Sequence, residues 1–202
     1  TGQPGRNTQY NTYFKATDNP LVNPATGGIL KGTFEPGRLE NAYFSFTAPD
    51  GREMLIFSLE MWPRDNVVTW AKGIAQQPQY ADSTAVLLTH AYLNSGDGYW
   101  DAGPEAYVMD GGNDGQQMWT ELVDVAGNFE MTFSGHVGGD GIGHRVNQSN
   151  AGDDVHQLLL NSQFEANGGN GWMRVLEFLD DGETVKVRTY SPHFGLQRTN
   201  AA

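Results

Sequence analysis

The stretch Ser83 to His90 reads Ser-Thr-Ala-Val-Leu-Leu-Thr-His, an apolar run that ends in a histidine. A second stretch, Asn128 to His136, reads Asn-Phe-Glu-Met-Thr-Phe-Ser-Gly-His and ends in the same way. The segment between them has helical spacing, which predicts a strand, a crossover helix and a parallel strand. Because parallel neighbours place their carboxyl ends at one sheet edge, where α/β sheets bind ligands, the two imidazoles should meet there. The sequence therefore predicts an α/β fold with a candidate metal site.

Composition limits the possible functions. The length of 202 residues suits one domain, residues 1–202, with a sizeable core. A formal net charge of −12 argues against nucleic acid or an anionic membrane surface as partner. No cysteine is present, so any metal must bind His, Asp, Glu or Asn. The longest apolar runs, such as Ala85 to Leu88, are far too short to cross a bilayer.

Apolar periodicity divides the rest of the chain into elements. Residues 1–38 are rich in Asn, Thr, Gly and Pro without a period, and are expected to form a loop-like lead-in. Helices are expected at Pro63 to Gln76 and Asp114 to Ala126, the second with a capping box of Asp114 and Gln117. Strands are expected at Asn41 to Thr47, Glu53 to Glu60, Thr84 to Thr89, Phe129 to Ser134, Val155 to Leu160, Trp172 to Leu179 and Thr184 to Tyr190.

Turn chemistry and loop length add detail to this layout. Pro49-Asp50-Gly51 and Asp180-Asp181-Gly182 predict two hairpin turns. Two long glycine-rich loops are expected, Ala91 to Gly112 and Gly135 to Asn150, and loops of such length are commonly functional.

Each candidate residue also has a structural reading. A single histidine at a strand end can simply bond a loop carbonyl, so His90 and His136 gain weight only as a pair. Tyr92 and Asn113 lie in or beside the first long loop and are candidates to line a substrate pocket. The alternative for Asn113 is that it holds the turn before the helix.

Several short segments carry a family resemblance. They are Thr89-His90-Ala91-Tyr92-Leu93, Gly112-Asn113-Asp114-Gly115-Gln116-Gln117-Met118-Trp119, Ser134-Gly135-His136-Val137 and Asn167-Gly168-Gly169-Asn170-Gly171-Trp172. Together they resemble segments of calcineurin-like metallophosphoesterases, in particular the secreted bacterial branch. The resemblance runs in order from about Thr8 to Arg198 and so covers nearly the whole chain.

The resemblance implies a fold and an activity. It implies part of a four-layer α/β/β/α sandwich with mixed sheets and two divalent transition metals, Zn, Mn or Fe, at the carboxyl edges of the strands. It also implies hydrolysis of a phosphoric ester, a monoester or a diester, by a metal-bridging hydroxide. An extracytoplasmic or secreted location is implied by the same branch.

Matched motifs of the resembling family imply that His90 and His136 are metal ligands. The sequence differs from the family's motifs in two places. The last position of the family's Gly-His-x-His motif is Gly138, so one ligand is absent from its place, and Asp140 or His144 could replace it from the same loop. The family's Asp-x-His, Gly-Asp-x-x-Asp and Gly-Asn-His-Asp motifs do not occur in this sequence. The chain therefore looks like a carboxyl-terminal half that contains no catalytic residue of its own. A separate amino-terminal fragment would carry the remaining ligands.

Two other functions remain open. The chain could be a non-catalytic binding or structural protein that retains the fold, which the missing motifs and Gly138 favour. It could also be a carbohydrate-binding module that stacks sugars on Trp100, Trp119 or Trp172, although buried packing is the simpler role for tryptophan. The predicted strand–helix–strand unit counts against such a module, because these modules are usually all-β.

Overall fold

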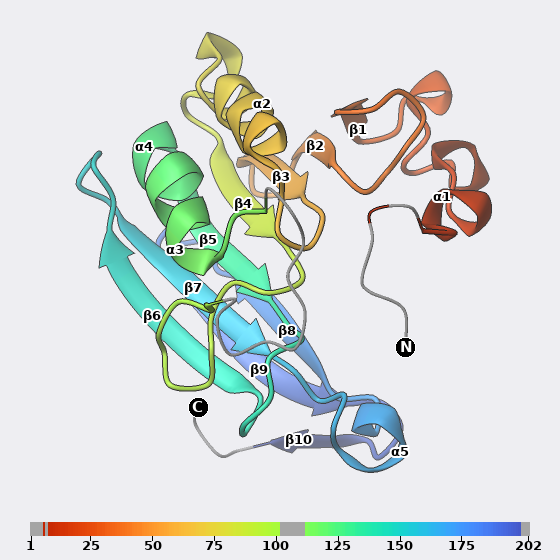
Figure 1. Ribbon diagram of the computed structural model, residues 1–202, viewed down its shortest axis with the longest axis vertical. Coiled ribbons are helices and arrows are strands. Elements are labelled where there is room, and N and C mark those ends of the chain that lie inside the picture. The colour runs from red at the N-terminus through yellow and green to blue at the C-terminus, as the bar shows by residue number, and fades with distance from the viewer. Residues whose placement is uncertain (1–5, 7, 102–111, 199–202) are drawn as a thin grey trace.

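A computed structural model describes residues 6, 8–101 and 112–198 of the chain, and it is an α/β fold with a mixed seven-stranded sheet and a small antiparallel sheet (Figure 1). The large sheet has the order β1-β2-β3-β4-β5-β7-β6, and the small one the order β10-β9-β8. The strands are β1 (Leu30–Thr33), β2 (Ala42–Thr47), β3 (Glu53–Ser58), β4 (Thr84–Leu88), β5 (Phe129–Ser134), β6 (Ile142–Gln148), β7 (Asp154–Leu160), β8 (Met173–Phe178), β9 (Val185–Ser191) and β10 (Leu196–Arg198).

The helices are α1 (Tyr10–Tyr13), α2 (Asp65–Ala75), α3 (Gly115–Met118), α4 (Asp124–Ala126) and α5 (Ala166–Gly169), with a π-helical turn, η4 (Trp119–Val123), between α3 and α4. Both expected helices are present with shorter bounds, as α2 and as the segment α3–η4–α4, whereas the short helices α1 and α5 were not expected. Short 3-10 turns η1 (Ala16–Asp18), η2 (Pro24–Thr26) and η3 (Pro78–Tyr80) complete the set.

Four parallel strands form the centre of the large sheet. The strands β3, β4, β5 and β7 pair side by side in parallel, which confirms the strand–helix–strand prediction around His90 and His136. Buried apolar residues fill these strands, as parallel strands covered on both faces require. The hairpin predicted at Pro49-Asp50-Gly51 is also present, as the antiparallel pair β2–β3.

Helices cover one face of the large sheet. The apolar face of α2 lies on Leu55 and Phe57 of β3, and the segment α3–η4–α4 packs beside it through Met118 and Leu122. The predicted capping box is present: Asp114 Oδ1 accepts from Gln117 N–H at 2.8 Å, and Gln117 Oε1 accepts from Asp114 N–H at 3.0 Å. This cap fixes where the second helical segment begins.

The three-stranded sheet covers part of the opposite face. Leu176, Phe178 and Val185 of β8 and β9 pack against Met54 and Met131 of the large sheet. The predicted turn at Asp180-Asp181-Gly182 joins β8 to β9. The described residues therefore form three layers: helices, a mixed sheet and an antiparallel sheet.

Three strands are absent from the sequence-based expectation. The loop-like lead-in 1–38 contains β1, the predicted loop Gly135 to Asn150 contains β6, and β10 follows the last expected strand. Each of the three is short or mostly polar and pairs antiparallel with the strand next to it in the sequence, so its own residues carry no apolar periodicity that marks it. Residues 102–111 of the other predicted loop lie outside the described residues.

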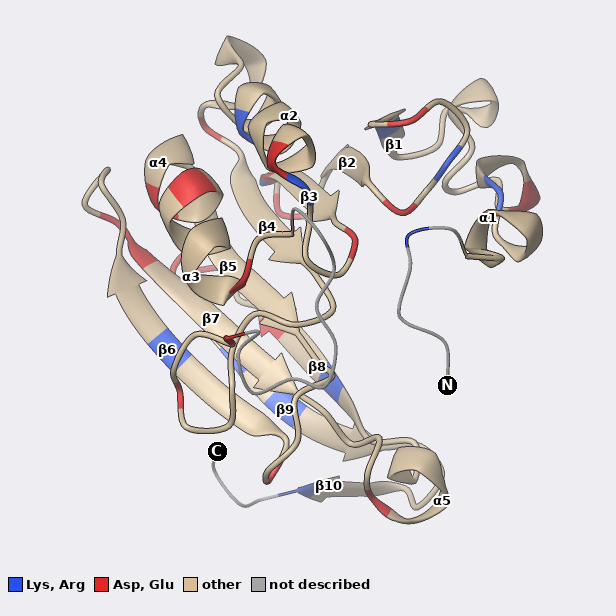
Figure 2. Cartoon of the chain, viewed as in Figure 1, with Lys and Arg blue, Asp and Glu red and all other residues tan. Residues whose placement is uncertain are grey.

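Charged side chains are spread over helices, loops and strands, without a large basic face in the view of Figure 2. The net charge of −12 therefore comes from dispersed carboxylates. In the part of the chain that the structure describes, no helix is long and apolar enough to cross a membrane.

Candidate metal centre

His90 lies at the carboxyl end of the central parallel strands. It follows β4 by two residues, and the strand is anchored there because Thr89 N–H donates to Phe133 O of β5 at 3.1 Å. Beyond this point the β4–β5 ladder ends. Gly135 N–H then donates to His90 O at 3.0 Å and joins the segments that follow the two strands. The residue is exposed at the surface.

His136 reaches the same edge from β5, in an unusual backbone conformation. Its φ is +63°, in the left-handed region that non-glycine residues rarely adopt. Val137 N–H donates to Gly135 O at 2.7 Å, which closes a γ-turn on His136. Strained turns of this kind cluster at ligand sites because the surrounding structure must hold them in place.

The two imidazoles lie together. The ring centroids of His90 and His136 are 4.6 Å apart with an interplanar angle of 37°. The structure thus brings together the two histidines that the sequence pattern predicts at one sheet edge. Both rings lie close enough to share one small ligand.

Asn161 holds the turn that carries His136. It follows β7, the next parallel strand, and its Nδ2 donates to His136 O at 2.8 Å and to Val137 O at 2.9 Å. Gln163 Nε2 adds a longer contact to His136 O at 3.3 Å. Neither residue is marked by a local sequence signal, since their contacts with His136 span 25 and 27 positions.

The electrostatics of the pair favour the neutral form of His90. Although the residue is exposed overall, partial desolvation of its ring lowers the pKa of His90, and the positive charge that His136 can carry lowers it further. A neutral imidazole is the form that ligates a metal.

None of the suggested replacements for the missing ligand joins this pair. Gly138 has no side chain, Asp140 accepts from Ile142 N–H at 3.1 Å in a local turn, and His144 is paired with His156 instead. Over residues 6, 8–101 and 112–198, no three side chains of His, Asp or Glu come together in a metal-binding group. The described site therefore offers two imidazole ligands.

Tyr92 lies in the core and not on a pocket wall. Its side chain is fully buried, and its ring meets Tyr99 edge-on with centroids 5.8 Å apart. Burial raises the pKa of the Tyr92 phenol well above its usual value. As the structure stands, this ring is closed off from any ligand in solvent.

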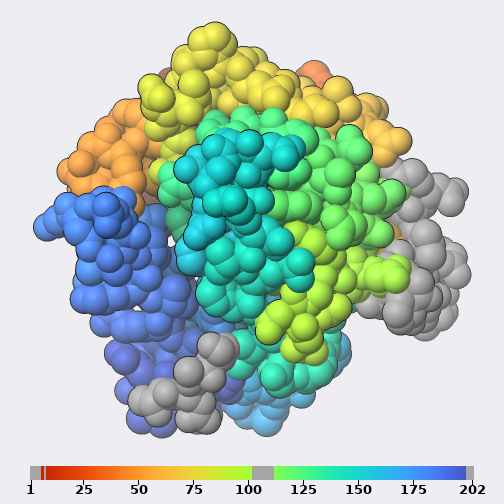
Figure 3. All heavy atoms as spheres, turned by 90° about the vertical axis from the view of Figure 1, so that its left-hand side faces the viewer, coloured from red at the N-terminus to blue at the C-terminus, as the bar shows by residue number. Residues whose placement is uncertain are grey.

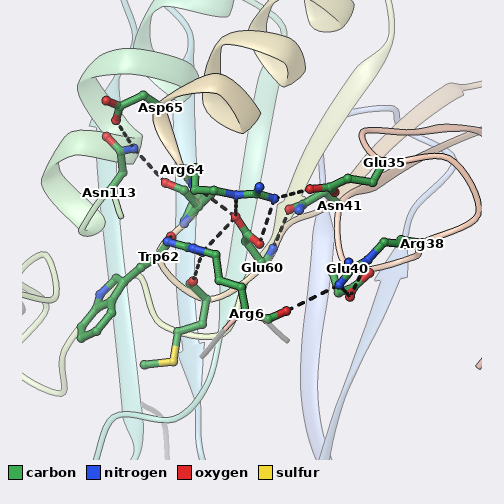
Figure 4. A network of polar contacts seen from close by, with 12 residues as sticks. Arg6, Glu35, Arg38, Glu40, Asn41, Glu60, Trp62, Arg64, Asp65 and Asn113 are labelled. Atoms are coloured by element: carbon green, nitrogen blue, oxygen red, sulfur yellow. Dashed lines mark hydrogen bonds and ion pairs between the residues drawn. The ribbon is translucent and has the colours of Figure 1, made fainter. Parts of the chain in front are cut away.

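Asn113 is a structural bridge. Its Nδ2 donates to Pro63 O at 2.8 Å and to Asp65 Oδ1 at 2.9 Å, so it ties the segment before α3 to the start of α2 (Figure 4). The residue is 5% exposed. This is the turn-holding role that the sequence left open as the alternative to substrate binding.

An ion-pair network that no sequence pattern predicts lies beside Asn113 (Figure 4). Glu60, just past β3, accepts from Arg6 at 2.9 Å and from Arg64 at 2.8 Å, and Arg64 also pairs with Glu35 at 2.6 Å (Figure 4). The network lines a hollow of about 200 Å³ together with Arg38, Glu40 and Asn41. Acids and bases are matched there, so the hollow presents no unbalanced charge for a ligand.

The tryptophans occupy different surroundings. Trp100 is 3% exposed and stacks on Trp62 with centroids 4.5 Å apart, and Trp119 is 8% exposed in the main core. Only Trp172 of the three is half-buried, and Arg198 covers its ring at 4.3 Å. Burial of the first two removes the flat exposed platform that sugar stacking needs.

Comparison with known proteins gives a distant similarity. No protein-family model matches the chain. The chain is similar to the uncharacterized protein YvnB of Bacillus subtilis (strain 168), at 24% identity over 165 residues. The match covers 75% of this chain and 11% of YvnB, so the chain corresponds to a small part of that relative's length.

Proposed function

We propose that the chain is the carboxyl-terminal part of a dinuclear calcineurin-like metallophosphoesterase that hydrolyses phosphoric esters. The observation that carries the proposal is the approach of His90 and His136, whose ring centroids lie 4.6 Å apart at the ends of neighbouring parallel strands. That placement supports the roles that the motif resemblance implies for both residues.

The donor set fits the proposed metals in kind and falls short in number. Imidazole nitrogen suits Zn, Mn or Fe, but two ions need more protein ligands than two histidines. When bound, such a pair of ions activates a water molecule and neutralises charge on the phosphoryl group. The remaining ligands, and all catalytic residues, are proposed to come from a separate amino-terminal fragment.

The architecture offers a place for that fragment. The described strand β8 pairs with β9 alone, which leaves an edge where another strand can add. A further strand and helix layer on this side would extend the three observed layers to the proposed four-layer sandwich. An extracytoplasmic or secreted location is proposed on the motif resemblance alone.

The test uses the native material. An intact mass well above 22.1 kDa, or a second co-purifying polypeptide, together with nearly two transition metals per molecule, supports the proposal. The assembly should then hydrolyse p-nitrophenyl phosphate or bis(p-nitrophenyl) phosphate, and His90→Ala and His136→Ala should each abolish that activity. A lone metal-free chain of 22.1 kDa without hydrolytic activity would contradict it.

A non-catalytic binding protein is the second candidate. The absence of a third metal-ligating side chain near His90 and His136, among the residues described, favours it. Robust metal-dependent hydrolysis by the native assembly would rule it out.

A further inference from the structure

A second pair of histidines lies away from the candidate metal centre. His144 of β6 and His156 of β7 face each other with ring planes only 8° apart and centroids separated by 5.5 Å. His144 Nε2 and His156 Nδ1 are 3.3 Å apart, within hydrogen-bonding distance. Both side chains are exposed, so a solute can reach these nitrogens.

The two strands hold this pair in a fixed register. β6 and β7 form an antiparallel ladder in which His144 pairs with Leu158 and His156 with Val146, so the histidines are diagonal neighbours on one face. The backbone at His144 has a further anchor, because its N–H donates to Asp97 Oδ1 at 2.8 Å. A rigid scaffold of this kind reduces the entropy cost of bringing two ligands to one ion.

The separation of the nitrogens suits one metal ion. Zn–N bonds of about 2.05 Å at a tetrahedral angle set two ligating nitrogens about 3.3 Å apart, which is the separation found here. We propose that His144 and His156 form a two-histidine clip for a divalent transition metal such as Zn²⁺. To bind the ion, both rings turn from their mutual hydrogen bond so that both lone pairs point at it.

The proton balance of binding is simple. In the metal-free pair one ring nitrogen donates its N–H to the other. Metal binding needs a lone pair on both, so the shared proton leaves that position and the same ring is reprotonated at its other nitrogen through solvent. Two neutral imidazoles therefore bind the ion without net release of a proton. The remaining coordination positions are open to water.

The clip is a different site from the His90–His136 pair. His156 is in register with Met131, three residues before β5 ends at Ser134, which places it about 10 Å back along the sheet. Both histidines of the clip line a cleft of about 1240 Å³ between the two sheets. Figure 3 shows the β6–β7 hairpin beside the carboxyl-terminal sheet on this side of the molecule.

The test is a Zn²⁺ titration of the full chain by isothermal calorimetry. A His90→Gln/His136→Gln variant removes the other histidine pair and is expected still to bind one Zn²⁺. Adding His144→Gln or His156→Gln should lower the Zn²⁺ affinity at least about tenfold. Loss of a direct ligand lowers metal affinity at least as much as loss of a residue that only supports a ligand. His193→Gln, at another exposed histidine, is the matched control and should change nothing.

NMR spectra locate the ion independently. Zn²⁺ should shift the imidazole C–H signals of His144 and His156 and leave that of His193 in place. Thermal unfolding checks that each variant folds, which is expected because His90, His144 and His156 are exposed and His136 is only half-buried. Unchanged Zn²⁺ affinity in both the His144→Gln and His156→Gln variants, or no binding in the His90→Gln/His136→Gln variant, would overturn the proposal. The proposed phosphoesterase function would stand in either case.

Discussion

Asn161 donates one amide group to two successive carbonyl oxygens, those of His136 at 2.8 Å and Val137 at 2.9 Å. The contact ties the end of β7 to the turn after β5. It also offsets part of the cost of holding His136 at a φ of +63°. The position of the His136 ring therefore depends on a residue 25 positions away.

Replacing Asn161 should disturb both stability and ligand binding. Asn161→Ala removes the donor to Val137 O and the shorter of the two contacts to His136 O, and we expect a loss of about 1–3 kcal/mol in the free energy of unfolding, measured by urea denaturation. Zn²⁺ affinity at the His90–His136 pair should fall as well. Gln163→Ala is the control, because it removes only one longer contact and should have a smaller effect. Equal effects of the two variants would contradict this role.

Gly138 is a position where a ligand can be added. Its φ lies outside the left-handed region, and a Cβ built there meets only the ring of Phe164, at 3.5 Å. Gly138→His should therefore fold, and it should raise metal affinity at least about tenfold. Changes to residues that only support the ligands already alter metal affinity by that much, and this change adds a ligand. Calorimetric titration with Zn²⁺ measures the change, and Gly138→Ala controls for the backbone. An affinity equal to that of Gly138→Ala would show that this position does not face the pair.

His90 should titrate below an ordinary histidine. Burial, followed by the charge of His136, lowers its pKa, so the folded chain resists the proton that the unfolded chain accepts near pH 6.5. Since the unfolded state binds more protons, stability falls as the pH drops through this range, and His90→Gln should lessen the fall. His136→Gln should raise the pKa only in part, because burial is the larger cause. NMR titration of the His90 ring measures its pKa in the unchanged chain and in the His136→Gln variant. A midpoint at or above 6.5 would refute the prediction.

The capping box at Asp114 should contribute measurably to stability. Asp114→Ala removes the acceptor for Gln117 N–H and should cost about 1 kcal/mol, read from the urea midpoint. Asp153→Ala, at an exposed position in a turn, serves as control and should change stability little. A cost for Asp114→Ala no greater than that control would show that the helix is fixed by packing alone.

Local patterns predicted the elements with strong periodicity. The continuous apolar runs of β4 and β5, and the helical spacing around Val67 and Ala71, identify buried strands and an amphipathic helix, and parallel pairing then brings His90 and His136 to one edge. The structure confirms these predictions. They could be made because each depends on residues that are close together in the sequence.

Composition and long-range contacts explain what the sequence did not reveal. Strand β6 contains His144, Arg145 and Asn147 and is stabilised by its hairpin ladder with β7, so its composition resembles a loop. The Glu60 network joins Arg6 across 54 positions, and no spacing rule marks such a contact. The burial of Tyr92 likewise depends on packing against elements distant in the chain.

The central claim is that His90 and His136 together ligate a metal ion, and Zn²⁺ titration of the His144→Gln/His156→Gln chain tests it most directly. That variant removes the second histidine pair, so any remaining imidazole site should be the first. We predict that one Zn²⁺ binds and that a further His90→Gln or His136→Gln substitution removes the binding. Zn²⁺ affinity that is unchanged by both further substitutions would contradict the account.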